Sequence, residues 1–202
     1  MKPAYESGAS ALYKEEDINR MITKLDAHHG HSLFGDIVEL GVNVGLRISD
    51  LLSIKMDDER LDVTKGLFYL VEQKTGKQQV TTFPPELMVS MINKRKALHP
   101  NHEFLFQSPS NRAKANSSHV SIRSVNRAME QAAKSLQLDG KFSSHALRKG
   151  FATALLEKGV PIETISKLLN HSSITTTQKY LDVGYNKMLE VRRMASFVRA
   201  VG

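Results

Sequence analysis

The stretch SSHALRKGFATALLEKG, residues 143–159, combines the apolar spacing of a helix with a polar pair near its start. The apolar positions on one helical face are Ala146, Leu147, Phe151, Ala154 and Leu155. Gly159 predicts the end of this helix. His145 and Arg148 are three residues apart, so they share one face of its first turn. An imidazole beside a guanidinium is either a solvated polar face or a pair directed at a phosphate, and the rest of the chain decides between them.

The composition of the chain restricts its class. It has 202 residues, of which 41% are hydrophobic, and this predicts a globular protein with a substantial core. The lack of cysteine excludes disulfides, thiolate zinc sites and a cysteine nucleophile. The net charge of +7 favours a polyanionic partner such as nucleic acid. Because the first residues are polar and no apolar run approaches about 18 residues, we expect a soluble protein of the cytoplasm.

The remaining segments predict a mainly helical chain. Apolar periodicity predicts, besides residues 143–159, helices that begin near Lys14, Leu33, Arg47, Pro85, His119 and Pro161. In residues 66–83, GLFYLVEQKTGKQQVTTF, aromatic and β-branched residues flank KTGK, which predicts a β-hairpin. Residues 1–13 are expected to be loosely ordered, and residues 185–202 to form a final amphipathic helix. We therefore predict a single α+β domain over residues 1–202, mainly α with a small antiparallel β-sheet.

Three short segments combine helix ends and small residues with basic or phenolic groups. They are GLRISDLLSIKMDD (residues 45–58), HALRKG (residues 145–150) and LLNHSSITTTQKY (residues 168–180). Taken singly, each has an ordinary structural explanation. Arg47 could cap a neighbouring helix end, His171 could cap its own helix, and Tyr180 could be a half-buried core residue.

Together with EQKTGKQQ (residues 72–79) in the hairpin, and in this order, these segments resemble the catalytic domain of the tyrosine recombinases, the phage-integrase and Xer-type family. The resemblance extends from about residue 12 to about residue 185. It implies the tyrosine recombinase catalytic-domain fold. It also implies a site-specific recombinase that cleaves and rejoins double-stranded DNA through a 3′-phosphotyrosyl intermediate, with no metal, ATP or other cofactor.

The resemblance assigns six catalytic positions. They are Arg47, Lys74, His145, Arg148, His171 and Tyr180. In this assignment Tyr180 is the nucleophile, and His145 accepts the proton of its phenol. The two arginines suit the phosphorane-like transition state, because a guanidinium stays charged and donates paired hydrogen bonds to phosphate oxygens.

The other assigned residues have supporting roles. Lys74 protonates the departing 5′-oxygen, although Lys77 competes for this role because the register of the hairpin is open. His171 donates a hydrogen bond to the phosphate, and Asp50 buttresses the site from behind it. Asn170 replaces the glycine that usually precedes this histidine in the family, which alters the local turn and removes no catalytic group.

The resemblance also predicts domain organisation and assembly. We expect no N-terminal core-binding domain, so the chain is either a natural single-domain enzyme or a fragment of a longer protein. We expect a monomer off DNA and a homotetramer on paired recombination sites. Residues 185–202 are expected to dock onto a neighbouring protomer, or alternatively to fold back onto their own domain. Two other functions stay open: a DNA-binding regulator that has lost cleavage, and a type IB topoisomerase-like enzyme.

Further basic and histidine residues have weaker assignments. The basic side chains expected to contact DNA, or else to lie in solvent, are Lys77, Arg112, Lys114, Arg123 and Arg127. The segment HHGHS, residues 28–32, could suggest a metal site. No carboxylate or thiol is patterned with these histidines, so we interpret them as a loop cluster and expect no metal.

Overall fold

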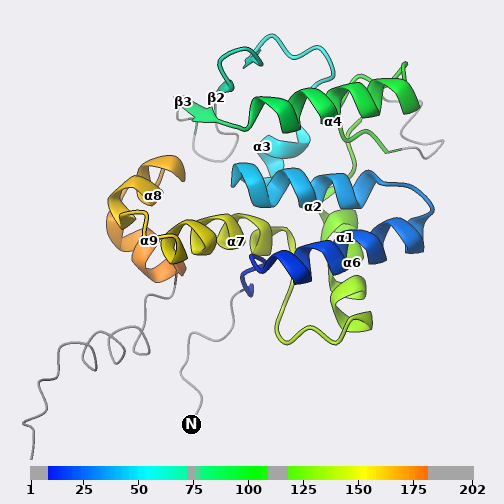
Figure 1. Ribbon diagram of the computed structural model, residues 1–202. Coiled ribbons are helices and arrows are strands. Elements are labelled where there is room, and N and C mark those ends of the chain that lie inside the picture. The colour runs from blue at the N-terminus through cyan, green and yellow to red at the C-terminus, as the bar shows by residue number, and fades with distance from the viewer. Residues whose placement is uncertain (1–8, 72–75, 77, 109–117, 182–202) are drawn as a thin grey trace, which may run out of the picture.

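The computed structural model describes residues 9–71, 76, 78–108 and 118–181 (Figure 1). Its elements in chain order are α1 (Glu15–His29), α2 (Leu33–Val44), α3 (Ile48–Leu52), β1 (Leu61–Asp62), β2 (Leu67–Val71), β3 (Gln78–Thr82), α4 (Pro85–Leu98), α6 (Ile122–Ser135), α7 (Ser144–Glu157), α8 (Ile162–Leu168) and α9 (Ile174–Leu181). The predicted fold class, mainly helical with one small antiparallel sheet, is confirmed. Within these residues no helix has the length and apolar character needed to cross a membrane.

Helix α2 is the centre of the fold, because most of its side chains are apolar and buried. Figure 1 shows α2 between α4 on one side and α1 and α7 on the other. A Cβ atom added to Gly41 would lie 2.7 Å from Cδ1 of Leu147, and one added to Gly45 would lie 2.2 Å from Cδ1 of Phe151. The two glycines therefore let α7 pack directly on the C-terminal end of α2, which brings the segments containing Arg47 and Arg148 together.

The three strands form one antiparallel sheet in the order β1–β2–β3. Strands β2 and β3 pair with Leu67 opposite Thr82. In β2, Phe68 is buried and its neighbour Tyr69 is exposed, which is the alternation of a strand with one face on the core. The predicted hairpin is thus confirmed, and its tip at residues 72–75 lies outside the described residues.

A small apolar cluster joins helices α7, α8 and α9. Its buried members are Ala152, Ile165, Leu169 and Leu181. Helices α8 and α9 pack on each other and on α7, and Tyr180 packs against the cluster from α9. The helix that carries the candidate nucleophile is therefore held by a few apolar contacts to α7 and α8 (Figure 1).

Residues 9–13, before α1, differ from the prediction, while residues 1–8 lie outside the described residues. Loose order is expected for residues 1–13, but Leu12 is a buried core residue whose N–H donates to the carbonyl oxygen of Ala146 at 3.1 Å. Gly150 permits this contact, because a Cβ there would lie 1.8 Å from the carbonyl oxygen of Leu12. The ordering of this segment depends on α7, far along the chain, so local sequence could not reveal it. The final helix predicted at residues 185–202 lies outside the described residues.

Candidate active site

Arg47 is the residue before α3 and follows a left-handed turn at Gly45, where φ is 65°. Its carbonyl oxygen accepts hydrogen bonds from the N–H groups of Asp50 and Leu51, both at 2.9 Å. Asp50 is 3% exposed, so this carboxyl group lies inside the protein, and its supporting role stays a prediction. The backbone of Arg47 is therefore fixed in position, and this determines where its partly buried side chain begins.

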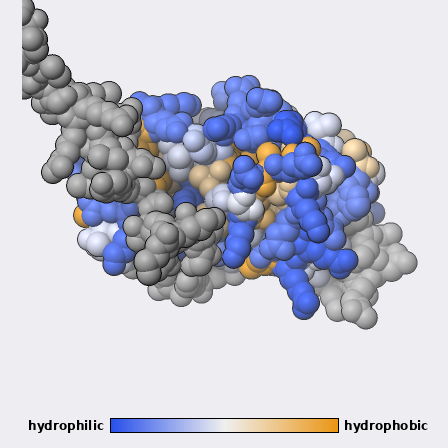
Figure 2. Space-filling model, turned by 90° about the horizontal axis from the view of Figure 1, so that it is seen from below, coloured by the Kyte–Doolittle hydropathy of each residue, from blue (hydrophilic) through white to orange (hydrophobic). Residues whose placement is uncertain are grey.

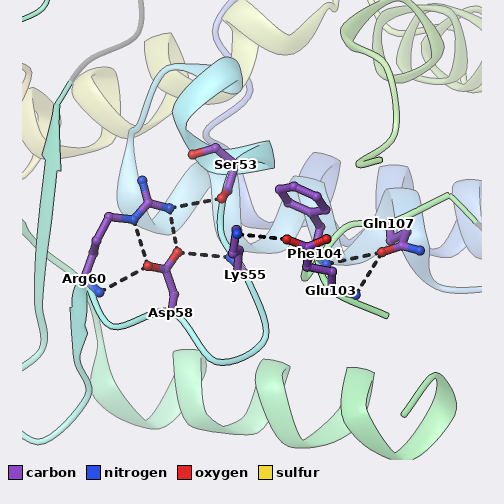
Figure 3. A network of polar contacts seen from close by, with 7 residues as sticks. All are labelled: Ser53, Lys55, Asp58, Arg60, Glu103, Phe104 and Gln107. Atoms are coloured by element: carbon purple, nitrogen blue, oxygen red, sulfur yellow. Dashed lines mark hydrogen bonds and ion pairs between the residues drawn. The ribbon is translucent and has the colours of Figure 1, made fainter. Parts of the chain in front are cut away.

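The C-terminal end of α3 is tied to the sheet by Asp58 and Arg60 (Figure 3). The Asp58 carboxylate accepts hydrogen bonds from the backbone N–H of Lys55 at 3.0 Å and from Nε of Arg60 at 2.7 Å. Nη2 of Arg60 donates both to Asp58, at 2.6 Å, and to the carbonyl oxygen of Ser53, at 3.0 Å. The carbonyl oxygen of Arg60 accepts from the N–H of Tyr69 in β2. This network connects the helix that begins after Arg47 to the hairpin.

Arg148 bridges three parts of the site from α7. Its side chain is buried, Nη1 donates to the carbonyl oxygen of Gly45 at 2.9 Å, and Nη2 donates to the carbonyl oxygen of Leu169. Gly45 ends α2 and Leu169 ends α8. Arg148 therefore fixes the segment before Arg47 and the segment before His171 relative to α7.

His145 lies in the first turn of α7 and is exposed. The N–H of the preceding residue, Ser144, donates to Oδ1 of Asn126 on α6 at 2.9 Å, which fixes the start of the helix. The hydroxyl of Tyr180 donates to the main-chain carbonyl oxygen of His145 at 3.4 Å. The two residues therefore meet at the start of α7.

His171 and Tyr180 contact each other across the turn between α8 and α9. Their ring centroids are 5.6 Å apart and their planes are at 83°, which is an edge-to-face arrangement. Asn170 has φ at 49°, in the left-handed region where the family usually has glycine, and asparagine tolerates this conformation. Asn170 therefore adopts the left-handed conformation that glycine takes readily, and the altered turn expected from this substitution is not found.

The electrostatic surroundings of Tyr180 connect it to both arginines. Burial raises the pKa of Tyr180 to about 12, while the charges of Arg148 and Arg47 act in the opposite direction. Both guanidinium groups are therefore near enough to stabilise negative charge at the phenol. The structure brings together five of the six predicted catalytic residues, namely Arg47, His145, Arg148, His171 and Tyr180.

Known proteins resemble most of this chain in sequence. The sequence model of the phage integrase family matches residues 12–187. The chain belongs to the phage integrase family. Among its relatives, tyrosine recombinase XerA of Pyrococcus furiosus is 29% identical over 162 residues, which cover 80% of this chain and 54% of that protein. Tyrosine recombinase XerC of Thermodesulfovibrio yellowstonii is 30% identical over 166 residues, covering 77% and 52%. This family member thus spans about half the length of these relatives.

The solved structures of similar fold include recombinases and an integrase. The crystal structure of XerA recombinase has a TM-score of 0.68 at 20% identity, covering 95% of this chain and 67% of that one. A post-cleavage complex of XerH recombinase with palindromic difH substrate has a TM-score of 0.66 at 19% identity, covering 93% and 53%. A λ integrase dimer bound to a COC′ core site has a TM-score of 0.65 at 21% identity, covering 90% and 51%. These likenesses confirm the predicted fold of the family's catalytic domain.

The remaining predicted site residues are placed differently. Lys74, Lys77, Arg112 and Lys114 lie outside the described residues, so their roles stay predictions. The other two basic residues expected to contact DNA are both exposed on α6, and they are Arg123 and Arg127.

The histidines of residues 28–31 form an aromatic cluster in this integrase family member. The centroid of the His29 ring is 4.8 Å from that of His28, 5.7 Å from that of His31 and 4.5 Å from that of Phe34. Burial lowers the pKa of His29, and the neighbouring histidines lower it further. Throughout the described part of the chain, no group of three or more histidine or acidic side chains has the arrangement of a metal site.

A hollow beside Tyr180 was not predicted from the sequence. Its volume is about 1000 Å³, and its polar lining includes His145, Tyr180, Lys134, Lys141, Lys149 and Lys179. Figure 2 shows one face of the molecule, which is mainly hydrophilic with some exposed apolar groups. The four lysines come from α6, α7, α9 and a loop, so their meeting depends on the tertiary fold.

Proposed function

We propose that this phage integrase family member is a site-specific recombinase that cleaves double-stranded DNA with Tyr180 and rejoins it. The observation that carries the proposal is the surroundings of the phenol. It donates to the backbone of His145, meets the ring of His171 edge-on and lies within the electrostatic reach of Arg47 and Arg148. Solved structures of the same fold include XerH recombinase bound to difH substrate and a λ integrase dimer bound to a COC′ core site, which supports DNA as the substrate of this chain.

The first step is a transesterification. The oxygen of Tyr180 attacks the scissile phosphorus, and the phenolic proton passes to His145. The bond from phosphorus to the 5′-oxygen breaks, and that oxygen takes a proton from Lys74. The products are a 3′-phosphotyrosyl protein and a 5′-hydroxyl end.

Two arginines suit the transition state because it gains negative charge on the non-bridging oxygens. Loss of one such preorganised donor typically lowers a rate by about 10²–10³. His171 donates a further hydrogen bond to the phosphate. The phosphodiester energy is kept in the tyrosyl ester, so a 5′-hydroxyl can attack it to rejoin DNA without ATP, and we propose that no metal is required.

Contacts beyond the scissile phosphate come from basic side chains. The four lysines line the same hollow as Tyr180 and His145, and they outnumber the one carboxylate among its described lining residues, that of Glu130, so they are suited to phosphates near the cleaved one. Arg123 and Arg127 on α6 are exposed and available for the same purpose. We propose that Arg112, Lys114 and Lys77 extend this contact.

Exchange between two duplexes needs more than one active site, so we propose that four protomers assemble on paired sites in the cytoplasm while the free protein is a monomer. The segment after Tyr180 is suited to join them. In the sequence, residues 185–202 carry apolar residues at helical spacing, with arginines at the positions between them. Docking of this segment on a neighbour would couple the positions of two tyrosines.

The test is covalent trapping on a nicked suicide substrate. The wild-type protein should form a covalent complex that maps to Tyr180, while Tyr180→Phe should bind the same DNA and form none. A covalent peptide containing Tyr185 would overturn the assignment. Binding without covalent product would favour the regulator, and relaxation of supercoiled plasmid without recombinants would favour the topoisomerase-like function.

A further inference from the structure

A buried hydroxyl connects the candidate nucleophile helix to a catalytic histidine. Thr177 lies on α9, three residues before Tyr180, and is 0% exposed. Its Oγ1 atom is 2.8 Å from Nδ1 of His171. The preceding residues Thr175 and Thr176 are exposed, so the three consecutive threonines have different surroundings.

The pairing decides where the ring of His171 carries its proton. A neutral imidazole has one N–H, and a hydrogen bond to one nitrogen sets the state of the other. If the Thr177 hydroxyl donates to Nδ1, the proton must be on Nε2. A neutral His171 can then donate from Nε2 to a phosphate oxygen without first becoming a cation.

We propose that Thr177 is a positioning residue that donates to Nδ1 of His171 and so holds the ring in its Nε2–H form. This inference rests on the proposed function, because it assigns His171 a phosphate as its acceptor. The main chain of His171 is fixed as well, because its backbone N–H donates to the carbonyl oxygen of Ser166 at 3.0 Å.

The same contact links the two halves of the active site. Arg148 holds the carbonyl oxygen of Leu169, two residues before His171, and Thr177 holds the His171 ring one turn before Tyr180. A continuous path of hydrogen bonds and short chain segments therefore runs from Arg148 to the nucleophile. The apolar cluster that packs α9 against α7 and α8 is small, and this polar link adds to the contacts that position Tyr180.

Three variants test the proposal in the suicide-substrate assay. Thr177→Val keeps the shape and removes the hydroxyl, Thr177→Ser keeps the hydroxyl, and Thr176→Val is the matched control on the exposed face. We expect Thr177→Val to slow single-turnover cleavage about tenfold or more, by analogy with the loss of a hydrogen-bond partner that orients a metal-bound histidine. Thr177→Ser and Thr176→Val should remain within about threefold of the wild type, and all three should bind a half-site equally.

The pH profile and the ring itself give readouts that a packing defect would not move. An imidazolium carries N–H on both nitrogens, so the deficit of Thr177→Val should shrink as the pH is lowered. In the DNA-free wild type labelled with ¹⁵N-histidine, NMR should find His171 protonated on Nε2 and bare on Nδ1, and Thr177→Val should show both tautomers.

A wild-type ring protonated on Nδ1 would overturn the proposal, as would Thr177→Val cleaving at the wild-type rate and pH profile. The NMR measurement on wild type decides the matter even if Thr177→Val fails to fold. It is also independent of cleavage: a wild-type protein that never forms a covalent complex contradicts the proposed recombinase function, whereas the tautomer reports on Thr177 alone.

Discussion

Replacing His145 by alanine tests whether its imidazole removes the proton of Tyr180. The hydroxyl of Tyr180 contacts the main-chain carbonyl of His145, which the variant retains. The His145 side chain is exposed, so its truncation removes little packing. The variant therefore deletes the candidate base while leaving the partner that holds the phenol.

The size of the effect follows from the pKa of Tyr180. Burial raises this pKa to about 12, with Arg148 and Arg47 acting against it. At about pH 7.5 the solution is about 4.5 pH units below that value, so forming the phenolate before attack requires about 6 kcal/mol, at 1.36 kcal/mol per unit. A base that takes the proton during the attack avoids this step, and such catalysis is typically worth about 10²–10⁴ in rate. We expect His145→Ala to lose a factor in that range.

The assay is single-turnover formation of the covalent complex on a suicide half-site between about pH 7 and pH 9. In His145→Ala only preformed phenolate reacts, so the rate should rise about tenfold per pH unit. The wild-type rate should rise less steeply. His28→Ala, which changes an exposed histidine at the end of α1, should match the wild type. Parallel pH profiles for wild type and His145→Ala, or rates within about twofold, would refute the assignment of His145 as the base.

Four other measurements address separate parts of the site. Lys74→Ala should cleave ordinary DNA slowly and recover on a 5′-bridging phosphorothiolate, whose sulfur leaves without a proton; recovery of Lys77→Ala instead would transfer the role to Lys77. Excess chelator should leave the cleavage rate unchanged, and a strict Mg²⁺ requirement would contradict charge neutralisation by the arginines. Asp58→Asn should lower the free energy of unfolding by about 2 kcal/mol at neutral pH. Burial raises the pKa of Asp58, but the hydrogen bonds and charge of Arg60 and the backbone N–H groups bring it below its usual value. The stability from Asp58 is therefore present above the unfolded pKa of about 4 and lost as the pH falls through the folded value, so urea melts should show a smaller difference near pH 3. Truncation after Gly184 should impair synapsis more than half-site binding, and full recombination by the truncated protein would exclude a docking role.

Features set by local spacing were predictable from the sequence. His145 and Arg148 share a helical turn because they are three residues apart, and α7 places them as expected. The hairpin followed from β-branched and aromatic residues around a short turn, and β2 and β3 confirm it. The ordered motifs gave the family, because each segment alone had an ordinary explanation and the set did not.

Features that depend on packing between distant segments were missed. In the run of threonines at residues 175–177, the motif spacing did not show which hydroxyl is buried. Thr177 is buried in the fold, where α9 packs against α7 and α8. Spacing from Tyr180 could not single it out, because Thr177 and the exposed Thr176 lie three and four residues before Tyr180 and both spacings place residues on one helical face. The lysines of the hollow belong to four separate segments, and no pattern within one segment could group them.

His145 and Arg148, the polar pair at the start of α7, differ in exposure and in hydrogen bonding. His145 is exposed and can exchange a proton with solvent, whereas Arg148 is buried and holds the carbonyl oxygens of Gly45 and Leu169. A guanidinium carries five N–H groups in a planar arrangement, so one such side chain is suited both to bind phosphate and to assemble the site. Arg148→Ala would remove a charge and also leave two carbonyls without this donor, at about 1–3 kcal/mol for each one that stays buried. Arg148→Lys would keep the charge without the planar fork that reaches both carbonyls. The cleavage rate of an Arg148 variant therefore reports on catalysis only when its free energy of unfolding shows that the variant is folded in the assay. His145 is exposed, so the cleavage rate of His145→Ala reports on proton transfer directly.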